Sequence, residues 1–178
     1  MAQTTWNIDG AHSQVEFGVR HLMISTVRGR FTTVSGSVSV DDAAWTNASV
    51  NAVIDVASIN TAEGARDNHL RSADFFDAEN HPSITFVSRR VEGSSPAQFK
   101  LIGDLTIRGT TREVTLDVSE EGRGKDPWGG ERIAFSAKTA IDRSAFGLTW
   151  NQALETGGVV VGNEVKITLD IQLVKQAA

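Results

Sequence analysis

The chain has 178 residues, of which 40% are hydrophobic and 22% are charged, and these proportions predict one folded domain over residues 1–178. Its 17 basic and 22 acidic residues give a net charge of −5, which argues against a protein that tracks nucleic-acid phosphates over a basic face. The absence of cysteine excludes disulfides, thiolate nucleophiles and cysteine-based zinc sites.

The beginning of the sequence has the features of neither a secretion signal nor a membrane anchor. Residues 1–10 contain no basic segment followed by an apolar one. No apolar run in the chain approaches the ~20 residues that a membrane-spanning helix needs. We therefore expect a cytoplasmic protein, or a periplasmic or secreted one if a leader has been removed from the sequence.

Apolar and polar residues alternate along much of the chain, as in β-strands that have one apolar face. In the first run, Val15, Phe17 and Val19 share one parity, and His21 continues it. The same alternation predicts further strands, in chain order, at residues 48–56, 83–87, 101–107, 114–118, 133–137 and 165–173.

One segment interrupts the strands with a helical pattern. Asn60, followed three residues later by Glu63, has the spacing of a capping box, and good helix formers come after it. We predict one main α-helix over about residues 60–73. Two adjacent phenylalanines, Phe75 and Phe76, follow this segment. A short helix with bulky apolar residues at its end is one way to close the mouth of an apolar cavity.

Turn residues separate the strands. Arg108–Thr111 predicts a hairpin, Gly93–Pro96 a second turn, and 122–130 a glycine-rich loop, while 157–158 lies in a stretch predicted to be flexible. Many strands, frequent turns and a single helix favour a closed antiparallel barrel over βαβ units. We predict an all-β barrel of about eight strands, with small inward residues that leave a cavity.

Several motifs follow one another along the chain. The most specific is Arg66–Ser72 followed by Phe75–Asp77 and Pro82–Phe86. The others are Trp6–Asp9 with His12–His21, Gly29–Phe31 with Val34 and Gly36, Gly103–Thr111, Arg143–Leu148, and Val161–Val165. In this order, from Trp6 to about Leu173, they resemble the YceI-like family, also called polyisoprenoid-binding proteins.

The resemblance implies an extended, lipocalin-like antiparallel barrel with a helix packed near one end. It also implies non-covalent binding, storage or transport of a long isoprenoid lipid, either a polyprenyl species or an isoprenoid quinone. We expect no other cofactor and no metal. We expect transient contact with a membrane and no nucleic-acid partner, and the resemblance is compatible with a homodimer. The expected ligand-binding residues are Phe17, Val19, His21, Phe31, Val38, Ile54, Leu70, Phe75, Phe76, Ile84, Phe86, Leu105, Phe135, Phe146 and Trp150.

The role of His21 can be interpreted in more than one way, because this polar residue falls among the apolar positions of its strand. It either donates to a head group such as a quinone carbonyl, or is satisfied by neighbouring protein groups, and the second interpretation is favoured. In a second functional hypothesis the protein is an enzyme for a hydrophobic substrate, with His21 as acid or base near Arg143 or Asp142. In a third, the barrel has a filled core and serves only as an interaction module.

No other cluster predicts catalysis or metal binding. His12 and Ser13 are neighbours in sequence, so in a strand their side chains point to opposite faces and do not form a nucleophile–base pair. His69 and the acidic residues near it do not match a metal-ligand spacing. We expect Arg66 and Asp67 to cap the helix or bridge it to neighbouring strands instead.

Overall fold

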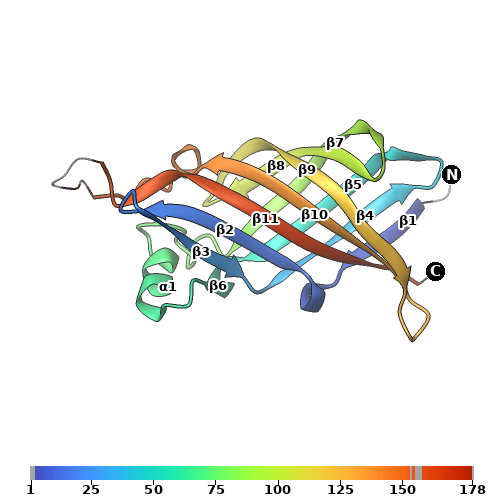
Figure 1. The fold of residues 1–178 in the computed structure, drawn as a ribbon, viewed down its shortest axis with the longest axis horizontal. Helices are drawn as coiled ribbons and strands as arrows, with labels where there is room; N and C mark the ends of the chain where they lie inside the picture. The colour runs from blue at the N-terminus through green and yellow to red at the C-terminus, as the bar shows by residue number, and fades with distance from the viewer. Residues whose placement is uncertain (1–2, 153, 155–157, 178) are drawn as a thin grey trace.

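We describe the protein from a computed structural model, which describes residues 3–152, 154 and 158–177. Strands make up most of it (Figure 1). They are β1 Gln3–Ile8, β2 Gln14–His21, β3 Ser25–Phe31, β4 Val34–Asp41, β5 Ala44–Asp55, β6 Ile59–Asn60, β7 Ser83–Ser95, β8 Gln98–Ile107, β9 Thr110–Lys125, β10 Glu131–Asp142 and β11 Val161–Lys175.

The sheet closes on itself through its first and last strands. β1 pairs with β4 on one side and with β11 on the other, where Ile8 lies opposite Leu173. The ring runs β1-β4-β5-β7-β8-β9-β10-β11 and is antiparallel at every pairing, so that eight strands form a closed barrel. Closure leaves these strands without an exposed edge over their paired lengths. The predicted all-β antiparallel barrel is therefore confirmed.

β1 and β2 share one edge of β11. Between them lies the short 3₁₀ helix η1 (Gly10–His12), which Asp9 caps by accepting a hydrogen bond from the Ala11 N–H at 3.1 Å. Gly10 is required at this break, because a Cβ atom there would lie 2.8 Å from the carbonyl oxygen of Val34. Beyond the break, β2, β3 and β6 extend the wall, in that order, at the end of the molecule where the helix lies (Figure 1).

The helix α1 (Gly64–Arg71) is shorter than the predicted 60–73 and begins at a different cap. Glu63 accepts hydrogen bonds from the N–H groups of Ala65 and Arg66, whereas Asn60 belongs to β6 and caps no helix. Pairing of β6 with β3 holds Asn60 in an extended conformation and delays the helix start. Among the described residues, no helix is long and apolar enough to cross a membrane.

The predicted bridge between helix and sheet is present. The buried Asp67 carboxylate accepts from both the main-chain N–H and the hydroxyl of Thr61, at 2.8 and 2.5 Å. Arg66 donates to the same hydroxyl and to the Thr61 carbonyl oxygen, both at 2.8 Å. Thr61 directly follows β6, so these bonds fix α1 against the end of the sheet.

The turns agree with the sequence in part. The hairpin at Arg108–Gly109 is confirmed, and both of its central residues have positive φ, 48° and 75°. The predicted glycine-rich loop at 122–130 is wrong in its first half, because β9 continues through Lys125 by pairing with β10. The turn predicted at Gly93–Pro96 lies later, since β7 extends to Ser95. Residue 157 lies outside the described residues.

Candidate functional site

A cavity of about 970 Å³ runs through the barrel. Val165 and Lys175 both line it, and they lie ten positions apart on β11. At about 3.3 Å per residue, the cavity extends for roughly 33 Å along that strand. Exposed side chains line both of its ends, Arg20 near α1 and Asp42 near the chain termini. The site is therefore an elongated channel and not a compact pocket.

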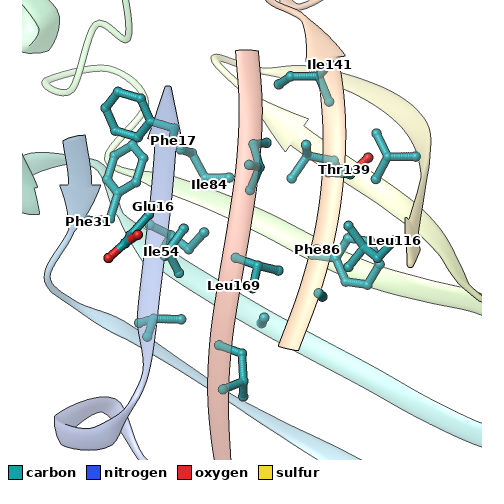
Figure 2. Close-up of a pocket in the computed structure, with 18 of the residues that line it drawn as sticks. Glu16, Phe17, Phe31, Ile54, Ile84, Phe86, Leu116, Thr139, Ile141 and Leu169 are labelled. Carbon is teal, nitrogen blue, oxygen red and sulfur yellow. The ribbon is translucent and has the colours of Figure 1, made fainter. Parts of the chain in front are cut away.

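The wall of the cavity is apolar over most of its length. Strands from all sides contribute inward aliphatic and aromatic side chains, among them Phe17, Ile54, Leu116 and Leu169 (Figure 2). Thr139 places a hydroxyl among them. Small inward residues keep the centre open, because a side chain that ends at Cβ cannot reach across a barrel of this width. These are Ala48, Ala52 and Ala137. The open channel contradicts the hypothesis of a barrel with a filled core.

Every residue predicted to contact the ligand lies in this wall. The set spans the barrel from Val38 on β4 to Trp150 before β11. It comprises Phe17, Val19, His21, Phe31, Val38, Ile54, Leu70, Phe75, Phe76, Ile84, Phe86, Leu105, Phe135, Phe146 and Trp150. Their contact with a ligand stays a prediction.

An aromatic cluster lines the cavity where α1 meets the barrel. The ring centroids of His69 and Trp150 lie 4.7 Å apart and those of Phe75 and Trp150 5.4 Å apart. His69 also stacks edge-on against Phe75 at 5.0 Å, and its Nε2 lies 2.9 Å from an oxygen of Asp74. We call His69, Phe75 and Trp150 the aromatic plug. It joins α1, the segment after it and the segment before β11.

Arg143 holds the segment that carries Trp150. Its guanidinium is buried, with 4% of the residue exposed, and donates to the carbonyl oxygens of Leu148, Gly162 and Val161 at 2.7, 2.8 and 3.3 Å. Burial lowers the pKa of Arg143, although a guanidinium still carries its charge at neutral pH. The side chain also lines the cavity, with its Cζ atom 6.0 Å from the centroid of Phe75.

The opposite end, which holds the chain termini, has a different lining. Asp41 is buried and accepts from the N–H of Ala43 at 2.9 Å, and Asp42 accepts from the Thr4 hydroxyl at 2.7 Å. Arg123 forms an ion pair with Glu120, and both side chains line the cavity. Polar groups at this end are therefore bound to one another.

The comparisons with known proteins agree with this geometry. The model of the YceI-like domain matches residues 6–173, which is nearly the whole chain. The chain belongs to the YceI-like family. Curated relatives include a UPF0312 protein of Staphylococcus aureus (strain USA300), which is 43% identical over 164 residues that cover 92% of this chain and 93% of the relative.

Solved structures show the same YceI-like barrel. BcnA of Burkholderia cenocepacia matches with a TM-score of 0.80 and 27% identity, over 93% of this chain and 98% of BcnA. The YceI protein of Campylobacter jejuni matches with a TM-score of 0.75 and 31% identity, over 89% of this chain and 90% of that one. A polyisoprenoid-binding domain of Saccharophagus degradans has a TM-score of 0.69 at 16% identity, over 96% and 98% of the two chains, and shows likeness of fold alone.

The groups proposed for catalysis in this YceI-like barrel have other partners. The Asp142 carboxylate accepts from the N–H and hydroxyl of Ser144, and Arg143 donates to main-chain carbonyls, so neither is hydrogen-bonded to His21. Ser13 is buried, and its hydroxyl accepts from the N–H of Gln172 at 3.0 Å, which fits the structural role expected for it. Within the described residues, no group of three or more His, Asp or Glu side chains could hold a metal ion.

Reasoning from the sequence missed the structural roles of two residues. The sequence suggests Arg143 only as a partner of His21, because no pattern along the chain indicates that it donates to the carbonyls of Leu148, Val161 and Gly162. His69 is weighed there only as a metal ligand, although it forms part of the aromatic plug. For His69, the sequence does offer one signal, which is its position in the predicted helix shortly before Phe75 and Phe76.

Proposed function

We propose that this protein binds one long isoprenoid lipid, a polyprenyl species or an isoprenoid quinone, non-covalently in the barrel. The observation that carries the proposal is the continuous apolar channel, which extends for roughly 33 Å along β11 and is open at its centre. The structurally similar domain of Saccharophagus degradans is described as polyisoprenoid-binding, which supports the same class of ligand. We propose that the protein stores or ferries this lipid, and that no catalytic step is involved.

The apolar wall suits such a ligand energetically. Each Å² of apolar surface removed from water contributes about 25 cal/mol, so a long hydrocarbon chain needs few polar contacts to be held. We expect the methyl branches of such a chain to fill the spaces between inward aliphatic and aromatic side chains. Because the wall supplies little beyond apolar surface, we expect affinity to rise with the number of isoprene units until the channel is full.

We propose that the head group lies at the helix end. Arg20, His21 and Arg143 all line the cavity there. A guanidinium has five N–H donors, and the three main-chain carbonyls leave some of those on Arg143 for an acceptor. A quinone carbonyl or a phosphate oxygen is such an acceptor. At the other end, the acidic lining residues Asp41, Asp42 and Glu120 outnumber the basic ones, Arg123 and Lys175, which disfavours an anionic head group.

Organic extraction of the purified protein followed by mass spectrometry tests the proposal, with one variant that blocks the channel. Ala137 faces the cavity at mid-barrel and is 7% exposed, so the phenyl ring of Ala137→Phe projects into the channel. Ala140→Phe is the matched control, because Ala140 lies on the same strand with its side chain exposed outside. We expect an isoprenoid in the wild type and in Ala140→Phe, and loss of most of it, by about tenfold, in Ala137→Phe.

Two results would reject the proposed ligand. One is a wild-type protein that yields no isoprenoid and does not take up added quinone. The other is an Ala137→Phe protein that folds with an unchanged circular dichroism spectrum and still carries as much lipid as the control. The second result would mean that the lipid lies outside the channel.

A further inference from the structure

The β2–β3 hairpin ends in an exposed apolar tip. Leu22, Met23 and Ile24 are 37%, 58% and 77% exposed, and they follow one another between the two strands. The β2–β3 turn lies at the helix end of the barrel (Figure 1). The tip is hydrogen-bonded to His21 and Val160, which line the cavity. Consecutive exposed apolar side chains at a loop tip are unfavourable in water. Such a patch therefore indicates a surface that binds an apolar partner.

The backbone of this tip is held in place. The N–H of Ile24 donates to the His21 carbonyl oxygen at 3.2 Å and closes a turn, and the N–H of Leu22 donates to the Val160 carbonyl oxygen at 2.8 Å. Arg20 donates to the Met23 carbonyl oxygen and to the Thr26 hydroxyl, both at 3.2 Å. The tip is therefore tied by hydrogen bonds to β2, β3 and Val160.

The turn also carries residues that its geometry disfavours. Leu22 and Met23 occupy its two central positions with φ of 54° and 62°. Positive φ at both central positions of a β-turn fits type I′, for which Asn-Gly is the preferred pair. Bulky side chains there cost free energy that Asn-Gly would not. Folding alone would favour the polar pair, so the apolar side chains have another use.

Basic side chains line a groove that runs from the tip along the outer face of the barrel. Arg20, Arg28, Arg30 and Lys166 line one groove together with Met23 of the tip. Two acidic side chains, Glu16 and Glu164, lie in the same groove, and four positive charges against two negative ones leave it positive. Within the described part of the chain, none of the four basic side chains forms an ion pair.

We propose that this hairpin docks the helix end of the barrel on an anionic lipid bilayer. Leu22, Met23 and Ile24 enter the acyl region, while Arg28, Arg30 and Lys166 contact acidic head groups. The combination of buried apolar area and basic charge is what holds peripheral proteins to such surfaces. Docking in this orientation puts the cavity end beside His21 against the bilayer, where a lipid can pass between the two. The proposal goes beyond the cavity ligand and does not depend on its identity.

Pelleting with vesicles tests the proposal on the full chain. The probes are phosphatidylcholine vesicles with and without phosphatidylglycerol. A molecule of net charge −5 is repelled by an anionic surface unless it presents a basic face. We expect the wild type to prefer the anionic vesicles, and Arg28→Ala and Arg30→Ala to weaken that binding about fivefold each.

A variant that improves the turn separates docking from folding. Leu22→Asn, Met23→Gly and Ile24→Thr together remove the apolar tip and install the preferred type I′ pair. We expect an equal or higher Tm and about tenfold weaker binding to anionic vesicles. Trp128→Ser is the matched control, because Trp128 is a large exposed side chain (86%) in the β9–β10 turn at the opposite end. We expect it to bind like the wild type.

Vesicle binding by the two variants can overturn the proposal. It is overturned if the triple variant binds anionic vesicles as the wild type does, or if Trp128→Ser weakens that binding as much as the triple variant does. It is also overturned if the wild type ignores anionic vesicles while the triple variant converts a dimer into a monomer in analytical ultracentrifugation, since a second copy then covers the tip. Loading with quinone from detergent should be unchanged in the triple variant. Loss of that loading would make the tip part of the cavity and would equally reject the docking role.

Discussion

The two ends of the barrel use their basic side chains in different ways. At the helix end, Arg20, Arg71 and Arg143 donate to main-chain carbonyl oxygens, which fixes loops while leaving the positive charge uncancelled. At the end with the termini, Arg132 pairs with the carboxylates of Asp9 and Asp126 at 2.7 and 3.0 Å. Lys175 lies 3.6 Å from Glu131 in the same region.

For the lipid binding proposed above, this difference predicts the end of the barrel at which the lipid enters and leaves. An arginine bound to carbonyls keeps its charge available to an acceptor that arrives from outside, whereas one bound to a carboxylate does not. The helix end therefore combines uncancelled charge, an aromatic plug and an exposed apolar tip. At the terminal end, Arg132 and Lys175 are paired with carboxylates of the protein itself. We infer that the lipid enters and leaves at the helix end. The ion pairs at the terminal end stabilise the closed barrel there.

The largest effect is expected from Arg143→Met, which removes the hydrogen bonds that Arg143 makes at the helix end and leaves the ion pairs of the terminal end unchanged. The change removes hydrogen bonds to three carbonyl oxygens from a buried charged group, and we expect a loss of about 3 kcal/mol in the free energy of unfolding. Urea denaturation measures it. Arg112→Met is the control, because exposed Arg112 donates to one carbonyl, that of Ala145. Equal losses in the two variants would mean that Arg143 does not hold this segment.

An intermediate effect is expected from Trp150→Ala, which opens the aromatic plug. Loss of its ring contacts with His69 and Phe75 removes about 1–1.5 kcal/mol, which corresponds to roughly tenfold faster release of bound lipid. Stopped-flow transfer of a fluorescent quinone analogue to acceptor vesicles measures the release rate. Trp128→Ala should leave that rate unchanged, and a faster rate in Trp128→Ala alone would place the exit at the other end.

The smallest effect is expected from Arg132→Ala at the terminal end, and it depends on pH. The hydrogen bond from Arg132, followed by that from His12, lowers the pKa of Asp9, while the N–H of Gly130 and then Arg132 lower the pKa of Asp126. The folded state thus favours both charged carboxylates. Their stabilisation is complete above the unfolded-state pKa of about 4 and is lost as pH falls through the lowered folded-state values.

Thermal unfolding between neutral and strongly acidic pH tests this sign. The wild type should lose Tm on acidification below about pH 4, and Arg132→Ala should start lower at neutral pH and lose less. The neutral-pH loss should be smaller than that of Arg143→Met. Parallel curves for wild type and variant would show that Arg132 does not set these pKa values.

The sequence predicted the wall of the channel better than its ends. Alternation places Val165, Ile167 and Leu169 on one face of a strand, and that period is local, so it can be read directly. The closing pair Ile8–Leu173 joins residues far apart in the chain, and no local pattern specifies it. The helix start was misplaced because Asn60 and Glu63 both suit a cap, and pairing of β6 decided between them.

The ends were hard to predict because their chemistry lies in main-chain partners. Nothing in the sequence near Arg143 indicates the carbonyls of Val161 and Gly162 as its acceptors, since those belong to a strand that returns later. Leu22–Ile24 has neither the period of a strand nor the composition of a turn. Only the closed hairpin shows that these side chains are exposed.

A crystal structure of the protein as purified from cells tests the central claim most directly. We predict continuous, tube-shaped electron density along the channel from the side of Val165 to the side of Leu173, with its wider end beside Arg143. Side chains that meet across the barrel, or separate water peaks along its axis in place of a chain, would contradict the account.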